Sequence, residues 1–323
     1  MTYTASTERL ELVVRAVSVE AERIKTFELA DPSGAELPEF TAGSHVDVEV
    51  PGGLVRQYSL SNSPVDRLRY EISVLAVDGG RGGSHAMHHD VRCGDKLRVS
   101  PPRNTFALDE TARHHVLVAG GIGITPIMSM VERLTTLAAS YTLVYCTRSP
   151  GQTAFHERLL RLAAERMILH HDGGDPARSI DLATILTPGP GTHLYCCGPE
   201  GMMRAVGVAT AAWIPGHVHV ERFTNPGLDG GAVTTGAGGF EIVLASSERR
   251  LMVAPHESII DVLRAAGIAV DSSCEAGVCG TCVTGWLDGA PDHRDLVLTD
   301  EERGHSMTIC CSRSLTRRLV LDL

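Results

Sequence analysis

Long apolar runs are missing from this sequence of 323 residues. No stretch approaches the roughly 20 consecutive apolar residues that a membrane-spanning helix needs. The N-terminus has neither the basic region nor the apolar region of a signal peptide. Charged residues make up 21% of the chain and mean hydropathy is +0.02, which is typical of a soluble globular protein. We therefore expect a cytoplasmic protein without membrane contact.

An excess of basic residues is also missing, because the formal net charge is −10 at pH 7. This charge disfavours nucleic acids and anionic membranes as partners and leaves a basic protein partner open. No internal repeat is visible, and a chain of this length is too long for one ordinary core. We expect two or three domains.

The nine cysteines are an odd number, and a reducing cytoplasm disfavours disulfides. Three of them crowd into the segment "SCEAGVCGTC" as Cys274, Cys279 and Cys282. A zinc site would more typically contain paired C-x2-C motifs, and a redox dithiol would not need the third cysteine. The C-x4-C-x2-C spacing is that of plant-type [2Fe–2S] clusters, which take a fourth cysteine farther along the chain. Cys310 and Cys311 are the candidates for it.

The residues around these cysteines fit the same interpretation. Gly277 and Gly280 let the backbone turn close to sulfur. Of the remaining cysteines, Cys93, Cys146 and Cys196 are predicted to lie in apolar surroundings. We expect these three to be buried core residues, which is the usual environment of free cysteine.

Hydrophobic patterning divides the chain into three domains. Residues 1–108 contain short β-branched runs separated by Gly, Pro and Asp, which predict an antiparallel β-barrel. Residues 109–225 alternate apolar strands with amphipathic helices and predict an α/β domain with a parallel sheet. Residues 226–238 are rich in Gly and Thr and predict a linker. Residues 239–323 contain strands, a helix and the cysteine segment, which predict an α+β domain.

Two segments of the barrel domain suggest a ligand with a phosphate and a flat ring. "RQYSLSN" reads as a strand with Arg56 and Tyr58 on one face and Gln57 and Ser59 on the other. An exposed strand with ordinary polar alternation would look the same. "GGRGGSH" strengthens the first interpretation, because glycines precede Ser84 as a predicted N-cap, and the start of a helix binds anions.

Two segments of the α/β domain have the form strand, turn and helix. "AGGIGITP" lets Gly120, Gly121 and Gly123 bring the backbone close to a diphosphate. It lacks the third glycine of the Rossmann fingerprint, and the next strand lacks the acid that would bind the ribose, so another mode of dinucleotide binding is needed. "YCCGP" lies at the carboxyl end of a later strand, where ligands of such sheets collect.

These motifs, together with "PPRNTF", "DHRD-VL" and the terminal "LVLDL", resemble those of the phthalate dioxygenase reductase family and its relatives, such as the vanillate demethylase reductases. The resemblance covers nearly the whole chain and places it in the ferredoxin-reductase superfamily. It implies a flavin-binding β-barrel, an NAD-binding α/β domain and a ferredoxin-like β-grasp domain. It also implies FMN, a [2Fe–2S] cluster and NADH as cofactors.

The function implied by this resemblance is that of a monomeric NADH-dependent reductase. It would pass electrons from NADH through FMN and the cluster to a separate terminal oxygenase of the Rieske non-haem iron type. A cytochrome P450 as the electron acceptor is one alternative. An iron–sulfur redox sensor that is not an enzyme is another, and steady NADH-to-cytochrome c turnover would dismiss it.

The resemblance also implies a set of site residues. The residues at the flavin are Arg56, Gln57, Tyr58, Ser59, Ser73, Val74, Leu75, Gly82, Gly83, Ser84 and Phe223. Those at the nicotinamide dinucleotide are Gly121, Gly123, Thr125, Pro126, Thr147, Arg148, Cys197, Gly198 and Pro199. Ser59, Thr125 and Cys197 are the expected catalytic residues, and the expected cluster ligands are Cys274, Cys279, Cys282 and Cys310.

Two expectations concern specificity and the partner. Arg148 stands where the 2′-phosphate of NADPH would be bound, but the resemblance favours NADH. In the C-terminal domain, acidic residues near the cluster segment are expected to steer a basic partner, unless they serve only solubility. These residues are Glu275, Asp288, Asp292 and Asp295.

Overall fold

The computed structural model describes residues 9–80, 82–225, 227–228 and 238–323. The chain divides into two compact units, one ending at Glu221 and the other running from Arg222 to Leu323. Most of the predicted linker, 226–238, lies outside the described residues.

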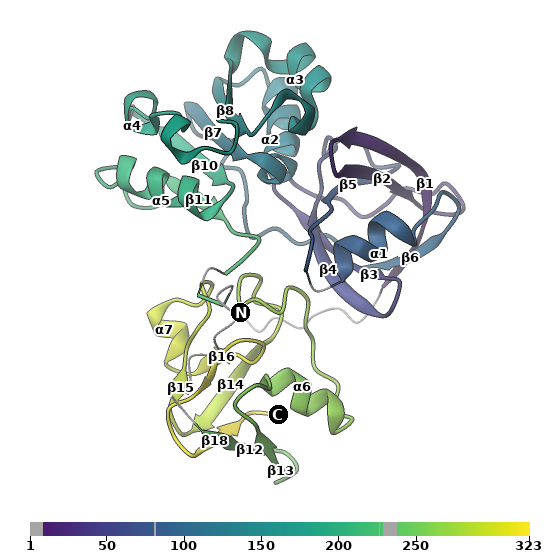
Figure 1. Cartoon of the computed structure of the whole chain (residues 1–323), viewed down its shortest axis with the longest axis vertical. Helices are drawn as coiled ribbons and strands as arrows, with labels where there is room; N and C mark the ends of the chain where they lie inside the picture. The colour runs from purple at the N-terminus through teal and green to yellow at the C-terminus, as the bar shows by residue number, and fades with distance from the viewer. Residues whose placement is uncertain (1–8, 81, 226, 229–237) are drawn as a thin grey trace. The chain divides into compact units, whose positions relative to one another are not determined.

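The first part of the N-terminal unit is an antiparallel six-stranded barrel (Figure 1) with the strand order β4-β3-β6-β1-β2-β5. A bridge between Leu60 and Ile72 joins its two ends. Alternate residues fill the interior, and Met87 of the single helix packs among them. The elements are β1 Leu10–Ala21, β2 Ile24–Ala30, β3 His45–Val50, β4 Leu54–Ser59, β5 Tyr70–Leu75, α1 Gly83–His89 and β6 Lys96–Val99.

The second part of this unit is a parallel five-stranded sheet with the order β11-β10-β7-β8-β9. Separate apolar clusters cover its two faces, one around α2 and α3 and the other around α4 and α5. Its strands are β7 His114–Gly120, β8 Tyr141–Thr147, β9 Met167–His171, β10 Thr192–Cys197 and β11 Val218–Glu221. Its helices are η1 Gly121–Gly123, α2 Ile124–Thr136, η2 Pro150–Gln152, α3 His156–Ala163, η3 Ala164–Arg166, η4 Pro176–Arg178, α4 Leu182–Ile185 and α5 Glu200–Ala209.

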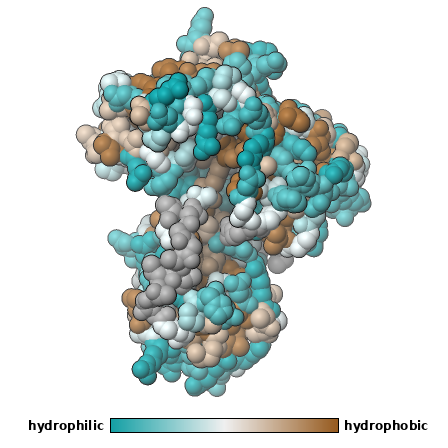
Figure 2. Space-filling model, viewed as in Figure 1, coloured by the Kyte–Doolittle hydropathy of each residue, from teal (hydrophilic) through white to brown (hydrophobic). Residues whose placement is uncertain are grey.

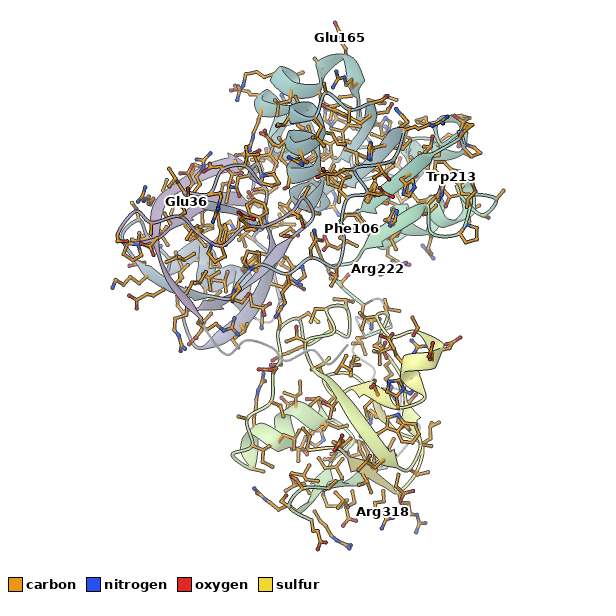
Figure 3. The ribbon with its side chains drawn as sticks, turned by 180° about the vertical axis from the view of Figure 1, so that it is seen from behind. Glu36, Phe106, Glu165, Trp213, Arg222 and Arg318 are labelled. Atoms are coloured by element: carbon orange, nitrogen blue, oxygen red, sulfur yellow. The ribbon has the colours of Figure 1, made fainter. Side chains whose placement is uncertain are left out.

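Barrel and sheet share one hydrophobic core. Ile24 and Ala42 of the barrel pack in the same cluster as the α2 face of the sheet. Phe106 (Figure 3) belongs to this cluster too, and its ring meets that of Tyr195 edge to face at 5.7 Å. This shared core explains why the two predicted domains form a single compact unit.

The C-terminal unit is a mixed five-stranded sheet with the order β13-β12-β18-β14-β16 and a small β15-β17 pair. β12 and β18 run parallel, and α6 packs its apolar face on this sheet. The elements are β12 Phe240–Leu244, β13 Arg250–Val253, α6 Ile259–Ala265, β14 Val283–Asp288, β15 Pro291–Asp292, α7 Asp300–Arg303, β16 Ser306–Thr308, β17 Arg313–Ser314 and β18 Arg318–Leu321. The cysteine segment lies between α6 and β14.

In the face shown in Figure 2, hydrophilic residues predominate, and hydrophobic residues form smaller areas scattered among them. Among the described helices, none is long and apolar enough to cross a bilayer.

Cys146 and Cys196 are buried, as expected, but Cys93 is exposed, so the prediction for it was wrong. It lies in the turn before β6, where its thiol meets the Arg15 carbonyl at 3.0 Å.

Candidate functional site

The predicted flavin strand is β4, and its arginine reaches the start of α1. A Cβ added at Gly83 would lie 2.5 Å from Cγ and 2.7 Å from Nε of Arg56. Gly83 is therefore the residue that lets this side chain lie against the first turn of the helix. Tyr58 of the same strand is largely enclosed, and burial raises its pKa, with Arg56 partly offsetting the effect. The structure thus brings the guanidinium, the ring and the helix start together.

The helix start differs from the expectation in one detail. Ser84 was predicted as the N-cap, but α1 begins at Gly83 and its N-cap is Gly82. Gly82 has φ 81°, a left-handed conformation that favours glycine. Ser84 is the second residue of α1, and its hydroxyl accepts a hydrogen bond from the Val77 amide at 3.2 Å.

The β5 residues predicted beside the flavin face different surroundings. The Ser73 hydroxyl is buried and bonds that of Thr26 at 2.6 Å. Val74 is in the barrel core, and its carbonyl meets Nε2 of His88 at 2.8 Å. Leu75 packs against the core shared with the sheet. The Ser73 side chain is therefore engaged in a hydrogen bond, and the side chains of Val74 and Leu75 pack against apolar cores.

The two predicted dinucleotide turns follow the adjacent strands β7 and β10, and they pack on each other. A Cβ added at Gly120 would lie 2.5 Å from Cδ of Pro199, and one at Gly123 would lie 2.5 Å from the carbonyl carbon of Cys197. Gly120 and Gly123 therefore make room for the other turn. At Gly121, with φ 53°, an added Cβ would meet no described atom within 4 Å. This glycine is the one whose surroundings leave space for a ligand.

The other predicted dinucleotide residues flank these turns. Thr125 is buried in the first turn of α2, where its hydroxyl donates to the Ile122 carbonyl at 3.1 Å, and Pro126 is buried beside it. Thr147 ends β8, and its hydroxyl meets Nδ1 of His171 at 2.8 Å. Arg148 follows it with an exposed side chain.

Glu221, at the carboxyl end of β11, is a site residue that sequence analysis missed. Burial raises the pKa of its carboxyl to about 8, although a hydrogen bond from Ser59 partly opposes the shift. Burial also raises the pKa of the Cys197 thiol, with smaller contributions from Glu221 and Cys196. The site therefore holds a neutral thiol beside a carboxyl that is largely protonated at neutral pH. Its position at the end of a strand was the available signal, in the "VERF" segment.

His45 is a second missed residue, and it lies opposite Ser59 in the β3–β4 register. Its side chain is buried, and burial lowers its pKa to about 4, with the charge of Arg103 adding to the effect. Neither ring nitrogen of His45, nor Oε2 of Glu221, has a hydrogen-bond partner among the described residues. Buried polar atoms are nearly always satisfied, so these orphaned atoms around Ser59 fit a site completed by a polar ligand or by water.

The thiols predicted as cluster ligands meet in the C-terminal unit. Cys274 contacts Cys279 and Cys310, and Cys310 also contacts Cys282. The segment carries them through Gly277 at φ 69° and Gly280 at φ 74°, as the glycine pattern predicted. Thiols are soft donors that suit iron, but among the described residues no group of three or more cysteine, histidine or acidic side chains is arranged to hold a metal ion, so the ligand set stays a prediction.

Cys311 occupies a different position from Cys310. Its sulfur meets the Thr308 hydroxyl at 3.2 Å, and a Cβ added at Gly277 would lie 2.5 Å from it. Cys311 thus lies between Gly277 and Thr308, and of the other cluster-region thiols it contacts Cys310, whereas Cys310 contacts Cys274 and Cys282 as well. This arrangement favours Cys310 as the fourth ligand.

The acidic residues expected to steer a partner are already paired. Glu275 lies 2.8 Å from Arg264, and Asp288 lies 2.6 Å from Arg318. Asp292 bonds Arg294 at 2.6 Å. Asp295 has a buried side chain that accepts from the amides of Val297 and Leu298. Each of these four carboxylates thus has a hydrogen-bond or ion-pair partner within its own unit, and the steering of a basic partner stays a prediction.

Phe223 is the one predicted flavin residue outside the N-terminal unit. It belongs to the unit that begins at Arg222, and its side chain is 42% exposed. Its packing on the flavin stays a prediction.

Known proteins similar to this chain have the same organisation. Residues 95–214 match the N-terminal domain of dimethylamine monooxygenase subunit DmmA-like proteins, and residues 242–315 match the 2Fe-2S iron-sulfur cluster binding domain. The chain is 46% identical to the reductase subunit of tert-butanol monooxygenase / tert-amyl alcohol desaturase from Aquincola tertiaricarbonis, over 97% of this chain and 96% of that protein.

Two solved structures extend this similarity. Phthalate dioxygenase reductase, described as a modular structure for electron transfer from pyridine nucleotides to [2Fe-2S], matches with a TM-score of 0.81 and 41% identity, over 98% of each chain. A type IV self-sufficient cytochrome P450 monooxygenase matches with a TM-score of 0.79 and 39% identity, over 98% of this chain and 41% of that one.

Proposed function

This chain belongs to the phthalate dioxygenase reductase family, and we propose that it passes electrons from NADH through FMN and a [2Fe–2S] cluster to a terminal Rieske oxygenase. The predicted family and the predicted three-part fold are confirmed. Its relatives are oxygenase reductase subunits, so the predicted class of enzyme, an oxidoreductase of electron transport, is also confirmed.

One observation carries the proposal. The similarity to phthalate dioxygenase reductase spans 98% of both chains, so the chain contains every part that takes electrons from a pyridine nucleotide to a cluster in that protein. The match of residues 242–315 to the 2Fe-2S domain supports the last of these parts, as do the pairwise contacts among its thiols.

The described residues fit these cofactors. The Arg56 side chain on the first turn of α1 would hold the FMN phosphate, and Gly121 would face the dinucleotide. The four cysteines Cys274, Cys279, Cys282 and Cys310 would hold the cluster. When bound, the flavin would accept a hydride from the nicotinamide and release single electrons to the cluster. This conversion is needed because the nicotinamide gives up two electrons at once, whereas the cluster accepts one.

The chain's own residues position the reactants and retain a proton. Ser59 hydrogen-bonds Glu221 and so links the end of the flavin strand to the end of β11. Cys197 presents a neutral thiol at the end of β10, and Thr125 anchors the first turn of α2. Because the pKa of Glu221 is about 8, its carboxyl retains a proton near neutral pH beside Ser59.

The domain boundaries and the location are part of the proposal. We assign residues 1–108 to FMN, 109–225 to NADH and 239–323 to the cluster, with 226–238 as the linker. Four of the nine cysteines are assigned to the cluster, and the other five, Cys93, Cys146, Cys196, Cys197 and Cys311, are reduced thiols that fit a reducing compartment such as the cytoplasm.

The test begins with the purified chain, whose acid extract should contain FMN and whose iron and sulfide contents should match one [2Fe–2S] cluster. NADH should then support reduction of cytochrome c, a one-electron acceptor. FAD in the extract, zinc in place of iron, or faster turnover with NADPH would each contradict the corresponding part. Coupled turnover with a purified Rieske oxygenase tests the partner.

A cytochrome P450 is the second candidate partner, because this chain matches a segment of a self-sufficient P450 over nearly its full length. Equal concentrations of a Rieske oxygenase and a P450 should be compared as acceptors. Coupled product formation with the P450 alone would replace the first assignment.

A further inference from the structure

A polar cavity of about 770 Å³ lies at the seam between the barrel and the parallel sheet, within the N-terminal unit. Its walls come from β1, β2 and β5 on the barrel side and from α2 and α3 on the sheet side. Elsewhere along the seam the two parts share an apolar core. On the cavity side, contact therefore depends on the polar groups that span it.

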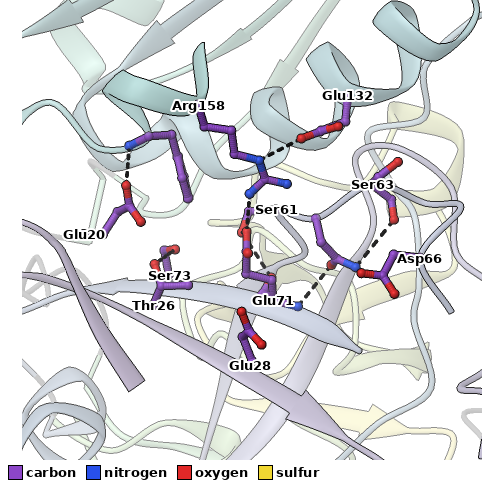
Figure 4. Close-up of polar contacts among 12 residues, drawn as sticks. Glu20, Thr26, Glu28, Ser61, Ser63, Asp66, Glu71, Ser73, Glu132 and Arg158 are labelled. Atoms are coloured by element: carbon purple, nitrogen blue, oxygen red, sulfur yellow. Dashed lines mark hydrogen bonds and ion pairs between the residues drawn. The ribbon is translucent and has the colours of Figure 1, made fainter. Parts of the chain in front are cut away.

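Arg158 of α3 is the main residue that spans the cavity (Figure 4). Its guanidinium bonds Glu71 of β5 at 2.7 Å through Nη1 and Glu132 of α2 at 2.7 Å through Nε. The side chains are only 21%, 8% and 17% exposed, in that order. One guanidinium thus holds a carboxylate of the barrel and a carboxylate of the sheet domain at the same time.

The Glu71 carboxylate continues this contact to the flavin strand. The same oxygen that meets Arg158 accepts from the buried hydroxyl of Ser61 at 2.8 Å. The Ser61 amide also donates to the Glu71 carbonyl at 2.9 Å. Ser61 lies two residues beyond Ser59, which ends β4, so a shift at Glu71 is passed to Ser59 through two peptide units.

A second clamp supports the same helix. The Glu20 carboxylate of β1 accepts from the Phe155 amide at 2.7 Å. Phe155 is the N-cap of α3 and has φ 57°, a left-handed conformation that is unfavourable for a side chain of this size. Two barrel carboxylates therefore bond the start of α3. Glu20 accepts from the Phe155 amide, and Glu71 accepts from the Arg158 guanidinium.

We propose that Arg158 is a positioning residue for hydride transfer, which acts through Glu71 and Ser61 to fix the nicotinamide-binding sheet relative to the flavin strand. This inference rests on the proposed function. Its physical basis is that a misplacement of about 1 Å between reactants can slow a reaction about 10²-fold. Burial opposes the positive charge, but Glu71 and Glu132 outweigh it and raise the pKa of Arg158, so the cation persists.

The two carboxylates provide a matched pair of variants. Glu71→Gln weakens the bond across the seam, whereas Glu132→Gln weakens the bond within the sheet domain, and each leaves Arg158 one carboxylate. We expect Glu71→Gln to lower the limiting rate of flavin reduction by NADH about tenfold, with little change in the half-saturating NADH concentration. Glu132→Gln should leave the limiting rate within about twofold of wild type, even if both variants lose similar thermal stability.

Equal slowing by the two variants, or no slowing by Glu71→Gln, would overturn the inference. If Glu71→Gln fails to fold, Arg158→Lys replaces it, because lysine keeps the charge but cannot bond both carboxylates in the same way. A slowed limiting rate in Arg158→Lys supports the inference, and an unchanged rate overturns it.

Amide hydrogen exchange separates this inference from the proposed function. If NADH does not reduce the wild-type flavin, the proposed function fails, and exchange alone decides the inference. Glu71→Gln should then speed exchange in both Ser61 and the start of α3, whereas Glu132→Gln should leave Ser61 unchanged. Unchanged exchange at both places in Glu71→Gln would overturn the coupling.

Discussion

Substituting Gly123 tests how closely the two dinucleotide turns must pack. Gly123 has φ −62° and ψ −4°, which alanine adopts without strain, so Gly123→Ala changes only the space beside the backbone. The added Cβ would lie 2.5 Å from the carbonyl carbon of Cys197 and 2.9 Å from the amide nitrogen of Gly198. Both are backbone atoms, so no side-chain rotation relieves the clash.

The size of the effect follows from these distances. Ordinary contact begins at 3.4 Å, so the Cys197 carbonyl carbon must withdraw by about 0.9 Å from its 2.5 Å distance. Overpacking of this kind costs about 1–3 kcal/mol of unfolding free energy. A displacement approaching 1 Å at Cys197 should slow hydride transfer by up to about 10²-fold.

Two measurements check this prediction. Stopped-flow loss of oxidised-flavin absorbance after mixing with NADH gives the rate, and thermal unfolding gives the stability. Gly207→Ala in the last turn of α5 is the control, because an added Cβ there meets no described atom within 4 Å outside the helix's own backbone. The control should gain about 0.5–1 kcal/mol and keep the wild-type rate. A Gly123→Ala protein with wild-type stability and rate would refute the reasoning.

Three further predictions follow from the site. Cys310→Ser should lose or distort the cluster while Cys311→Ser keeps it, because Cys310 contacts Cys274 and Cys282 whereas Cys311 contacts Cys310 and Thr308; iron and sulfide contents decide, and the reverse pattern would move the ligand to Cys311. Gly277→Ala should also impair cluster retention, since its Cβ would lie 2.5 Å from the Cys311 sulfur. Adding Cys311→Ala should restore part of the lost cluster content. The remaining loss comes from the left-handed backbone at position 277, with φ 69°, which alanine rarely adopts; no restoration would exclude the clash as the cause. The pKa of Glu221 is raised from 4.5 to about 8 in the fold, so the unfolded chain releases its proton first and wild-type stability falls as pH rises through that interval. Relative to Glu221→Gln, the loss should approach about 1.4 kcal/mol per pH unit in urea unfolding, and parallel pH profiles of the two proteins would contradict the assignment.

The cluster and the order of the parts could be predicted from the sequence because both depend on local patterns. Three of the four thiols lie in one short segment, and the glycines at 277 and 280 turn it through left-handed conformations. The barrel and the sheet follow from alternation and from strand-to-helix changes along the chain. In each case, neighbouring residues carry the signal.

What only the tertiary structure decided depends on residues that are distant in the sequence. Glycines 120 and 123, whose approach to a diphosphate stays a prediction, make room for the turn at Cys197, more than 70 residues away. The same is true of Ser59 with Glu221 and of Arg158 with Glu71, which lie 87 positions apart. No local spacing encodes such pairs, because the β-strand register and the shared core bring them together. The sequence by itself therefore determined the cofactor class and the parts, whereas the tertiary structure decided which residues hold the parts in register.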